Sequence, residues 1–292
     1  MLIRFKPIGL EKVWGGNILS KLYNMDSSSI GEIWGISAHK SHSNLITYGM
    51  YQGMAFRELY TSHRELFGNL KNDEFPLLFK IIQAAGDLSI QVHPDDAYAE
   101  SNEKSLGKEE CWYILKTFNK STNIIIGHSA ANKQEFLDAL NNNQIENIVN
   151  RLRINTGNYF YIPAGTIHAI CKDTMLLEVS QSSDITYRLY DYNRLDTGKL
   201  RELHLKKAKE VVTIPDNSVI TKHDSKIFDF RVVNNTKISA LIAHKYGDYI
   251  YVIDGQGLCN DEEIKTGEFL MISSEDSYVL EGILKYALIN VS

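Results

Sequence analysis

Cysteine is scarce in this chain of 292 residues, and its pattern excludes a disulfide-rich protein. The three cysteines, Cys111, Cys171 and Cys259, are widely spaced and odd in number. A disulfide framework needs paired cysteines and an oxidising compartment. We therefore expect free thiols in a reducing compartment, which predicts a cytoplasmic protein.

Long hydrophobic runs and a basic excess are also missing. No apolar stretch approaches the roughly 18 residues needed to span a bilayer, and the opening MLIRFKPIGL lacks the apolar core of a signal peptide. The 31 Lys and Arg residues face 36 Asp and Glu residues, which gives a formal net charge of −5. A general nucleic-acid binder carries the opposite balance. We expect no membrane and no nucleic-acid partner, and any site for an anionic substrate must be a local basic exception.

Few segments have the apolar spacing of a helix. It occurs at 56–68, at two short stretches within 129–152 with a turn at 141–143, and at 203–212. Most of the rest consists of short runs rich in β-branched and aromatic residues, such as FPLLFKII, MLLEVSQ and YIYVIDG, bounded by turn residues. There is no alternation of strand and helix and no Gly-rich nucleotide loop. The pattern predicts a mainly β protein built as a sandwich or barrel.

The composition changes near 212–218. Most of the histidines and the dense aromatic motifs precede this segment, and a simpler series of strands with glycine turns follows it. The change predicts two domains, residues 1–212 and residues 213–292.

Three strand ends carry polar residues that can converge on a metal ion. Gln91 and His93 lie two apart in LSIQVHPDD, so they share one face of a strand. Glu110 begins the strand of GKEECWYIL, and His168 follows a Pro-Ala-Gly turn in GNYFYIPAGTIHAI. Two His, one Glu and one Gln suit a divalent ion such as zinc. Glu109 and Glu110 are adjacent, so only one can face inward, and the strand pattern alone does not decide between them.

At these segments the chain resembles the cupins. The spacing Gly157-x5-Pro163-x-Gly165-x2-His168 matches the second cupin motif, and residues 86–93 resemble the first motif with Gln91 in place of its first His. Longer signatures are similar to class I, zinc-dependent mannose-6-phosphate isomerases: FPLLFKIIQAAGDLSIQVHPDD, GKEECWYIL, YFYIPAGTIHAI and LLEVSQSSDITYRLYDYNR. They occur in the family's order between about residues 6 and 201. Lys172 replaces the Asn that often ends the second cupin motif.

The resemblance implies a fold, a cofactor and a reaction. The fold is two tandem cupin-like (jelly-roll) β-barrels with a small helical insertion, and the second barrel lacks metal ligands. One Zn²⁺ per chain is implied at Gln91, His93, Glu110 and His168; Glu110 is favoured over Glu109 because the family's ligand directly precedes the Cys-Trp pair. Whether Gln91 completes the set stays open. Arg188 matches the family's catalytic arginine, and the implied reaction interconverts mannose 6-phosphate and fructose 6-phosphate through an enediol.

Two lysines are candidates for substrate binding. Lys80 lies within an otherwise apolar strand, where a charge needs a partner or a purpose. Lys108 lies two residues before Glu110, in a charge-rich stretch where a solvated lysine is the alternative. Both could supply positive charge to a sugar phosphate. The base that moves the proton stays open among Asp184, a zinc-bound water and His93.

Two other functions compete with an isomerase. A cupin dioxygenase would use iron and O₂ at a similar ligand set, but Gln91 and the Arg188 motif oppose it. A non-catalytic module that binds a sugar phosphate would not need the intact ligands and Arg188. We therefore predict an isomerase that acts on a small sugar phosphate as a monomer or small homo-oligomer.

Overall fold

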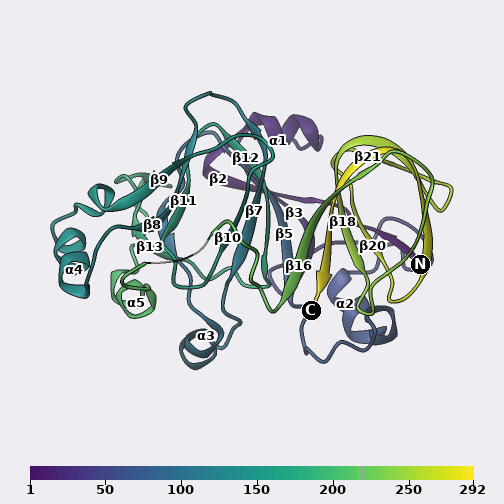
Figure 1. Cartoon of the computed structure of the whole chain (residues 1–292), viewed down its shortest axis with the longest axis horizontal. Coiled ribbons are helices and arrows are strands. Elements are labelled where there is room, and N and C mark those ends of the chain that lie inside the picture. The colour runs from purple at the N-terminus through teal and green to yellow at the C-terminus, as the bar shows by residue number, and fades with distance from the viewer. Residues whose placement is uncertain (217, 219) are drawn as a thin grey trace.

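Antiparallel strands make up most of the molecule and form three large sheets (Figure 1). The computed structural model describes residues 1–216, 218 and 220–292. Figure 1 shows a five-stranded sheet and a C-terminal sheet at opposite ends, with a central sheet between them. The prediction of a mainly β chain is confirmed.

The central sheet has seven strands in the order β10-β7-β12-β5-β3-β2, with β4 paired to β3. Its strands are β2 (Ile8–Gly16), β3 (Ile30–His39), β4 (His42–Ser43), β5 (Leu77–Ala84), β7 (Glu110–Thr117), β10 (Tyr159–Ile162) and β12 (Thr174–Gln181). The five-stranded sheet has the order β13-β6-β11-β8-β9. Its strands are β6 (Ile90–Val92), β8 (Asn123–His128), β9 (Val149–Arg153), β11 (His168–Ile170) and β13 (Tyr187–Tyr190).

The C-terminal sheet has the order β1-β20-β18-β21-β16, with β17 beside β21 and β19 beside β18. Its strands are β1 (Leu2–Arg4), β16 (Phe228–Asn235), β17 (Ser239–Ile242), β18 (Asp248–Cys259), β19 (Glu262–Lys265), β20 (Phe269–Ile272) and β21 (Ser277–Val291). A separate small hairpin joins β14 (Leu195–Asp196) to β15 (Lys199–Leu200).

Short helices decorate the sheets. They are α1 (Asn17–Leu22), α2 (Phe56–Ser62), α3 (Asp96–Glu103), α4 (Lys133–Asn141) and α5 (Leu205–Val211), with 3₁₀ turns η1 (Arg64–Phe67) and η2 (Ile145–Asn147). None of the described helices is long and apolar enough to cross a membrane.

The sequence predicts three of these helical regions correctly. The α2–η1 region ends at Gly68, which has a left-handed φ of 59°, and α4 and α5 lie where apolar spacing placed them. The second helix expected within 129–152 is wrong, because only η2 forms there. The residues that follow make strand β9, whose Val149 and Leu152 pair with His128 and Ile124 of β8. Pairing with a neighbouring strand therefore outweighs the local helical spacing.

The largest apolar core lies between the central sheet and the C-terminal sheet. The ring of Phe79 on β5 lies 6.0 Å from that of Tyr249 on β18. Gly35 on β3 permits the close approach of the sheets, because a Cβ there would overlap the Phe269 ring. A second core lies between the central and five-stranded sheets, where Trp112 and Ile126 are buried together.

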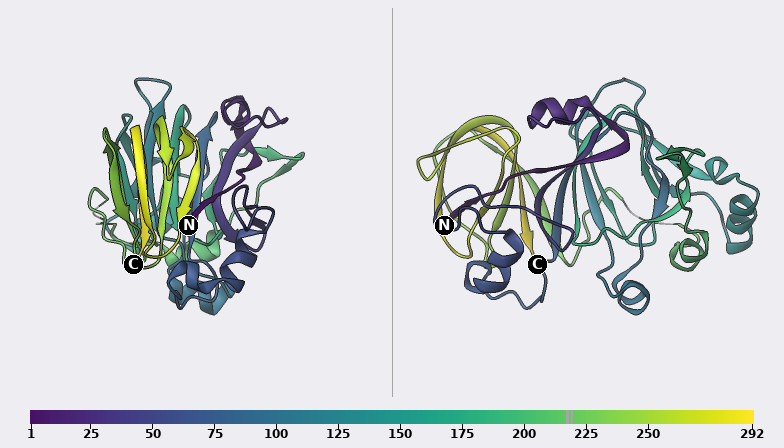
Figure 2. Two further views of the ribbon diagram at one scale, coloured as in Figure 1. Left: turned by 90° about the vertical axis from the view of Figure 1, so that its right-hand side faces the viewer. Right: turned by 180° about the vertical axis from the view of Figure 1, so that it is seen from behind.

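The N-terminal strand crosses to the C-terminal sheet. Leu2 of β1 lies opposite Ile272 of β20. Figure 2 shows the purple N-terminal segment leading from the C-terminal sheet to the central sheet, where β2 lies. The sequence assigned residues 2–4 to the first domain, but the strand they form is an edge of the C-terminal sheet.

Candidate metal centre and substrate cleft

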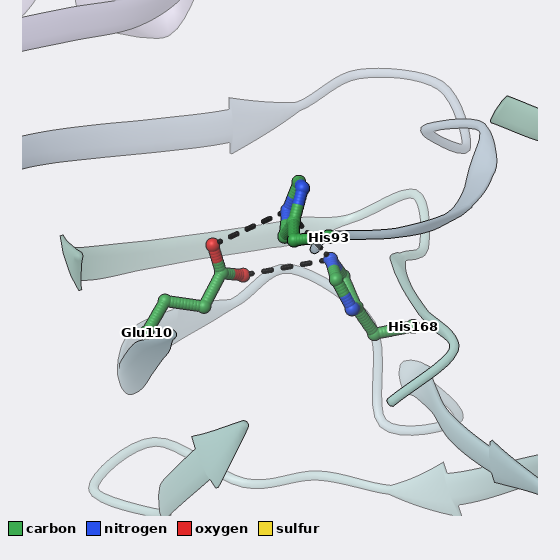
Figure 3. A group of neighbouring side chains, drawn as sticks. All are labelled: His93, Glu110 and His168. Atoms are coloured by element: carbon green, nitrogen blue, oxygen red, sulfur yellow. Dashed lines mark hydrogen bonds and ion pairs between the residues drawn. The ribbon is translucent and has the colours of Figure 1, made fainter. Parts of the chain in front are cut away.

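Three buried side chains from three strand ends converge on one point (Figure 3). Their donor atoms all lie within 4.8 Å of one another. The Nε2 atoms of His93 and His168 are 3.1 Å apart, and the two oxygens of Glu110 lie 3.5 and 3.6 Å from them. Each of the three residues is only 1% exposed. Within the described part of the chain, this is the group of His, Cys, Asp and Glu side chains that can hold a metal ion.

The sheets explain why these residues meet. His93 directly follows β6, Glu110 begins β7, and His168 begins β11 next to β6. Gly165, in the turn before β11, donates its N–H to the carbonyl of His93 at 2.9 Å. Its φ of 85° lies in the region that favours glycine. The turn therefore fixes the two histidine segments relative to each other.

Glu110, not Glu109, is the carboxylate that faces the histidines. Glu109 accepts hydrogen bonds from the hydroxyls of Tyr161, at 2.9 Å, and Ser225. Adjacent strand residues point to opposite faces, so the two glutamates separate into different environments.

Both imidazoles direct their Nε2 atoms to the common point. The Nδ1–H of His93 donates to the carbonyl of Ile185 at 2.7 Å, and that of His168 donates to the carbonyl of Thr166 at 2.9 Å. Such bonds fix the tautomer in which Nε2 can bind a metal. Burial lowers the pKa of His93 well below its usual value, and the positive charge of Lys108 lowers it further. Burial also lowers the pKa of His168.

The donor set fits zinc. A tetrahedral zinc ion with ligands at about 2.0–2.1 Å separates neighbouring donors by roughly 3.3 Å, and the observed separations are 3.1, 3.5 and 3.6 Å. Glu110 Oε1 is buried and has no hydrogen-bond partner among the described residues. An unpartnered buried carboxylate oxygen is costly, and a cation would relieve that cost.

Gln91 lies at the edge of this group. Its side-chain Nε2 is 3.3 Å from His168 Nε2, and its Oε1 accepts from Ser89 at 3.2 Å. A half-turn of the amide would exchange the two atoms and direct the oxygen toward the common point.

A cleft of about 230 Å³ adjoins the three donors. Gln91 and Lys108 line it, and both also touch the donor residues. Five basic and three acidic side chains face it: Lys12, Lys80, Lys108, Arg188, Arg201, Glu32, Glu178 and Asp184. The cleft is thus a local basic exception in a chain of net charge −5.

Lys80 and Lys108 share a buried carboxylate, Glu178. Lys80 Nζ lies 3.5 Å from Glu178 Oε1, and Lys108 Nζ lies 3.2 Å from the same oxygen. Lys108 also pairs with Glu110 and lies 3.2 Å from His93 Nε2. Burial lowers the pKa of Lys108, but the two carboxylates outweigh that effect and raise it overall. Lys108 is therefore a buried ammonium group and not a solvated one.

Arg188 lies beside the donors in the five-stranded sheet. It is opposite Gln91 on β6, and Gln91 is opposite His168 on β11. Residues paired across antiparallel strands share a face, so the three side chains lie abreast. The guanidinium lines the cleft, and its buried Nε has no hydrogen-bond partner in the described part of the chain.

Sequence reasoning missed four charged residues of the cleft: Lys12, Glu32, Glu178 and Arg201. Glu178 and Glu32 are lone charges in apolar strands, the same signal that identified Lys80, and both pair with that lysine. Arg201 follows the β14–β15 hairpin and carried no such signal, because only the tertiary fold brings it to the cleft.

Comparison with known proteins places this geometry in a family. The family model of the phosphomannose isomerase type I catalytic domain matches residues 2–140. The mannose-6-phosphate isomerase ManA of Bacillus subtilis (strain 168) is 47% identical over 214 residues, which cover 72% of this chain and 68% of the relative. The chain belongs to the type I phosphomannose isomerase family. The resemblance seen in the sequence is thereby confirmed.

Two further relatives agree with the assignment to the phosphomannose isomerases. The mannose-6-phosphate isomerase of Streptococcus mutans (serotype c) is 45% identical over 207 residues, which cover 70% of this chain and 65% of that protein. The crystal structure of the mannose 6-phosphate isomerase from Bacillus subtilis superposes with a TM-score of 0.92 at 35% identity and covers 99% of both chains. The phosphomannose isomerase fold therefore extends over nearly the whole chain.

Proposed function

We propose that this protein interconverts D-mannose 6-phosphate and D-fructose 6-phosphate by moving a proton between C1 and C2 through an enediol. One observation carries the proposal: a buried His93–Glu110–His168 group adjoins a cleft with an excess of basic side chains. The reaction needs charge stabilisation, orientation and proton transfer at a bound sugar. No specific observation favours a dioxygenase or a non-catalytic binding module.

The cofactor is one zinc ion per chain, held by His93, Glu110 and His168, with Gln91 as the fourth protein ligand after its amide has turned. The neutral tautomers of the histidines and the lone oxygen of Glu110 support this assignment. When bound, a zinc ion supplies Lewis acidity that polarises a sugar oxygen. If Glu110 and His93 bound the metal, Lys108 would still have Glu178, 3.2 Å from its Nζ, as a partner.

Arg188 is the proposed catalytic residue. An arginine stays protonated and offers a planar fork to an oxyanion. Its place abreast of Gln91 and His168 supports contact with the reacting end of the sugar. The guanidinium would donate to the oxygen that becomes negative as the enediolate forms.

Lys80 and Lys108 are the proposed substrate-binding lysines. Both line the cleft, and Glu178 holds both ammonium groups in place. Trp34 packs on Lys80, with the ammonium 5.0 Å from the ring centroid. The lysines would donate hydrogen bonds to hydroxyl or phosphate oxygens of the sugar. Because their side chains are already held in place, little conformational entropy would be lost on binding.

Membership of the family supports a proposal for the architecture and for the cellular setting. We propose two tandem cupin-like jelly-roll units, residues 1–212 and 213–292, with β1 crossing from the first to complete the sheet of the second. The second unit would carry no metal. The protein would work in the cytoplasm as a monomer or small homo-oligomer, on a small sugar phosphate and with neither nucleic acid nor membrane as partner.

A coupled assay for fructose 6-phosphate formed from mannose 6-phosphate tests the function. The wild type should turn over without consuming O₂. In Arg188→Lys the charge stays but the fork is lost, so kcat should fall about 100-fold or more. Arg57→Lys on α2, whose guanidinium pairs with the exposed Glu74, is the matched control and should keep the wild-type rate. No product, or O₂ uptake with the sugar, would refute the isomerase, and an unchanged kcat in Arg188→Lys would refute the role of Arg188.

A further inference from the structure

Arg201 lies where two cavities meet. It lines the substrate cleft together with Lys12 and Trp14. The same three residues line a second cavity of about 510 Å³. Gln91 and Lys108, which are neighbours of the metal donors, line the substrate cleft but are not among the described residues that line the second cavity. Arg201 therefore marks the side of the cleft that continues away from the donors.

A buried carboxylate holds Arg201 in place. Asp191 is only 4% exposed, and its two oxygens accept from Arg201 Nη1 at 3.1 and 3.3 Å. Arg194 also pairs with Asp191, and it donates to the carbonyl of Asp87 as well. One carboxylate thus serves two guanidinium groups, which leaves one positive charge uncompensated at this point. Among the side-chain nitrogens of Arg201, only Nη1 makes a hydrogen bond to a described residue, so Nη2 and Nε are left for a ligand.

Arg201 and Arg188 bring two like charges to the same cleft. Both arginines line the cleft, and the positive charge of Arg201 lowers the pKa of Arg188 beyond the larger effect of burial. None of the described residues makes a hydrogen bond with Arg188 Nε. Two partly buried cations that repel each other are stabilised when an anion lies between or beside them.

The two arginines occupy different positions relative to the donors. Arg188 is abreast of Gln91 and His168 in the five-stranded sheet, whereas Arg201 follows the β14–β15 hairpin outside that sheet. A hexose 6-phosphate has its reacting carbons at one end and its phosphate at the other. If the reacting end lies at Arg188 and the metal donors, the phosphate is directed toward the Arg201 side.

We propose that Arg201, positioned by Asp191, binds the phosphate group of the hexose phosphate and thereby selects phosphorylated over free sugars. This inference rests on the proposed function and adds to it a residue for the phosphate. Lys12 lines both cavities together with Arg201, and its ammonium group, which lies 3.3 Å from Glu32 Oε2, would add positive charge on this side of the cleft. The β14–β15 hairpin that precedes Arg201 would then be part of the substrate site.

The test is a kinetic comparison of the wild type with Arg201→Gln, using inorganic phosphate as the competitive inhibitor. The KM for mannose 6-phosphate and the inhibition constant for phosphate should each rise about 10-fold or more, while kcat stays within about 3-fold. Arg201→Lys should fall between the two. Arg57→Gln on α2 is the matched control and should leave all three constants unchanged. Unchanged KM and inhibition constant, or a loss of kcat alone, would overturn the role of Arg201.

Asp191 is a positioning residue, and a double-mutant comparison separates that role from a merely structural one. Asp191→Asn should raise KM and the phosphate inhibition constant with kcat largely kept. If it acts through Arg201, the double variant Asp191→Asn/Arg201→Gln should be no worse than Arg201→Gln alone. Fully additive losses would show that Asp191 does not act by holding Arg201.

Calorimetric titration of the wild type and Arg201→Gln with inorganic phosphate separates this inference from the proposed function. If the wild type fails to convert mannose 6-phosphate, the proposed function fails, but phosphate binding that Arg201→Gln loses would still support Arg201. If the enzyme converts the sugar normally and phosphate binds both proteins equally, the inference fails while the function stands. Absence of phosphate binding to the wild type would also overturn it.

Discussion

At the scale of single residues, the site depends on charged side chains that are buried as ion pairs. Lys80, Lys108 and Glu178 are each less than 10% exposed, and every one has an oppositely charged neighbour. A buried ion pair is tolerated only when its geometry replaces the lost hydration, and removal of one partner leaves the other uncompensated. Glu110 differs because one of its oxygens has no hydrogen-bond partner within residues 1–216, 218 and 220–292. That difference supports Glu110 as a ligand for a cation, because its second oxygen is available to bind one.

Removal of one imidazole should empty the metal centre without unfolding the protein. In His168→Ala, only His93 and Glu110 remain of the three close donors, so zinc affinity should fall by at least the roughly 10- to 100-fold that loss of an outer-shell partner costs. Metal analysis after dialysis and the isomerase rate should fall together, with an unchanged far-UV circular dichroism spectrum. His63→Ala at the end of α2, where the side chain is 31% exposed, is the control. Wild-type metal content and rate in His168→Ala would contradict the assignment of His168 as a ligand.

At the scale of secondary-structure elements, a single turn couples two ligand segments. The turn at 163–165 leads from β10 to β11, and the Gly165 N–H reaches the carbonyl of His93. A Cβ on Gly165 would overlap the Thr213 hydroxyl and lie 3.0 Å from the Val211 carbonyl oxygen. A glycine is therefore required at this position for two reasons: its positive φ, and the close packing of the segment that contains Val211 and Thr213.

Gly165→Ala should be more destabilising than an alanine placed at a similar φ in open space. Gly53 has a φ of 89°, and no atom lies within 4 Å of the position that a Cβ would take there, so Gly53→Ala should cost about 1 kcal/mol of unfolding free energy from backbone strain alone. Gly165→Ala should cost about 2–4 kcal/mol, because the clash adds to the strain. Urea unfolding of the two variants measures the difference. Equal losses would show that the turn does not need the space beside Thr213.

The sequence predicts elements well where local pattern and tertiary environment agree. The apolar runs that became β5, β7 and β12 were predicted because a strand buried on both faces needs no alternation. The residues 149–152 were assigned to a helix because their apolar spacing fits one, yet they pair with β8 as a strand. No local signal tells that β1 lies in the C-terminal sheet, since its partner β20 lies at the other end of the chain.

At the scale of the whole molecule, the site draws together segments that are far apart along the chain. His93, Glu110 and His168 could be predicted to form one site because each lies in a recognisable motif, and because the family resemblance assigns the three motifs to one metal centre. Arg201 and Glu32 were missed, because their place in the cleft depends on how a hairpin and strand β3 sit against it. The net charge of −5 also says little about the substrate, because positive charge is concentrated in the cleft against the overall sign.

The central claim is that zinc at the His93–Glu110–His168 group makes this chain an isomerase. The most direct measurement is stepwise addition of zinc to metal-stripped protein, with bound metal and the rate of mannose 6-phosphate conversion followed together. We predict a rate that rises in proportion to bound zinc, levels off at one ion per chain, and is abolished again by a chelator. A full rate in protein shown by metal analysis to be zinc-free would contradict the claim.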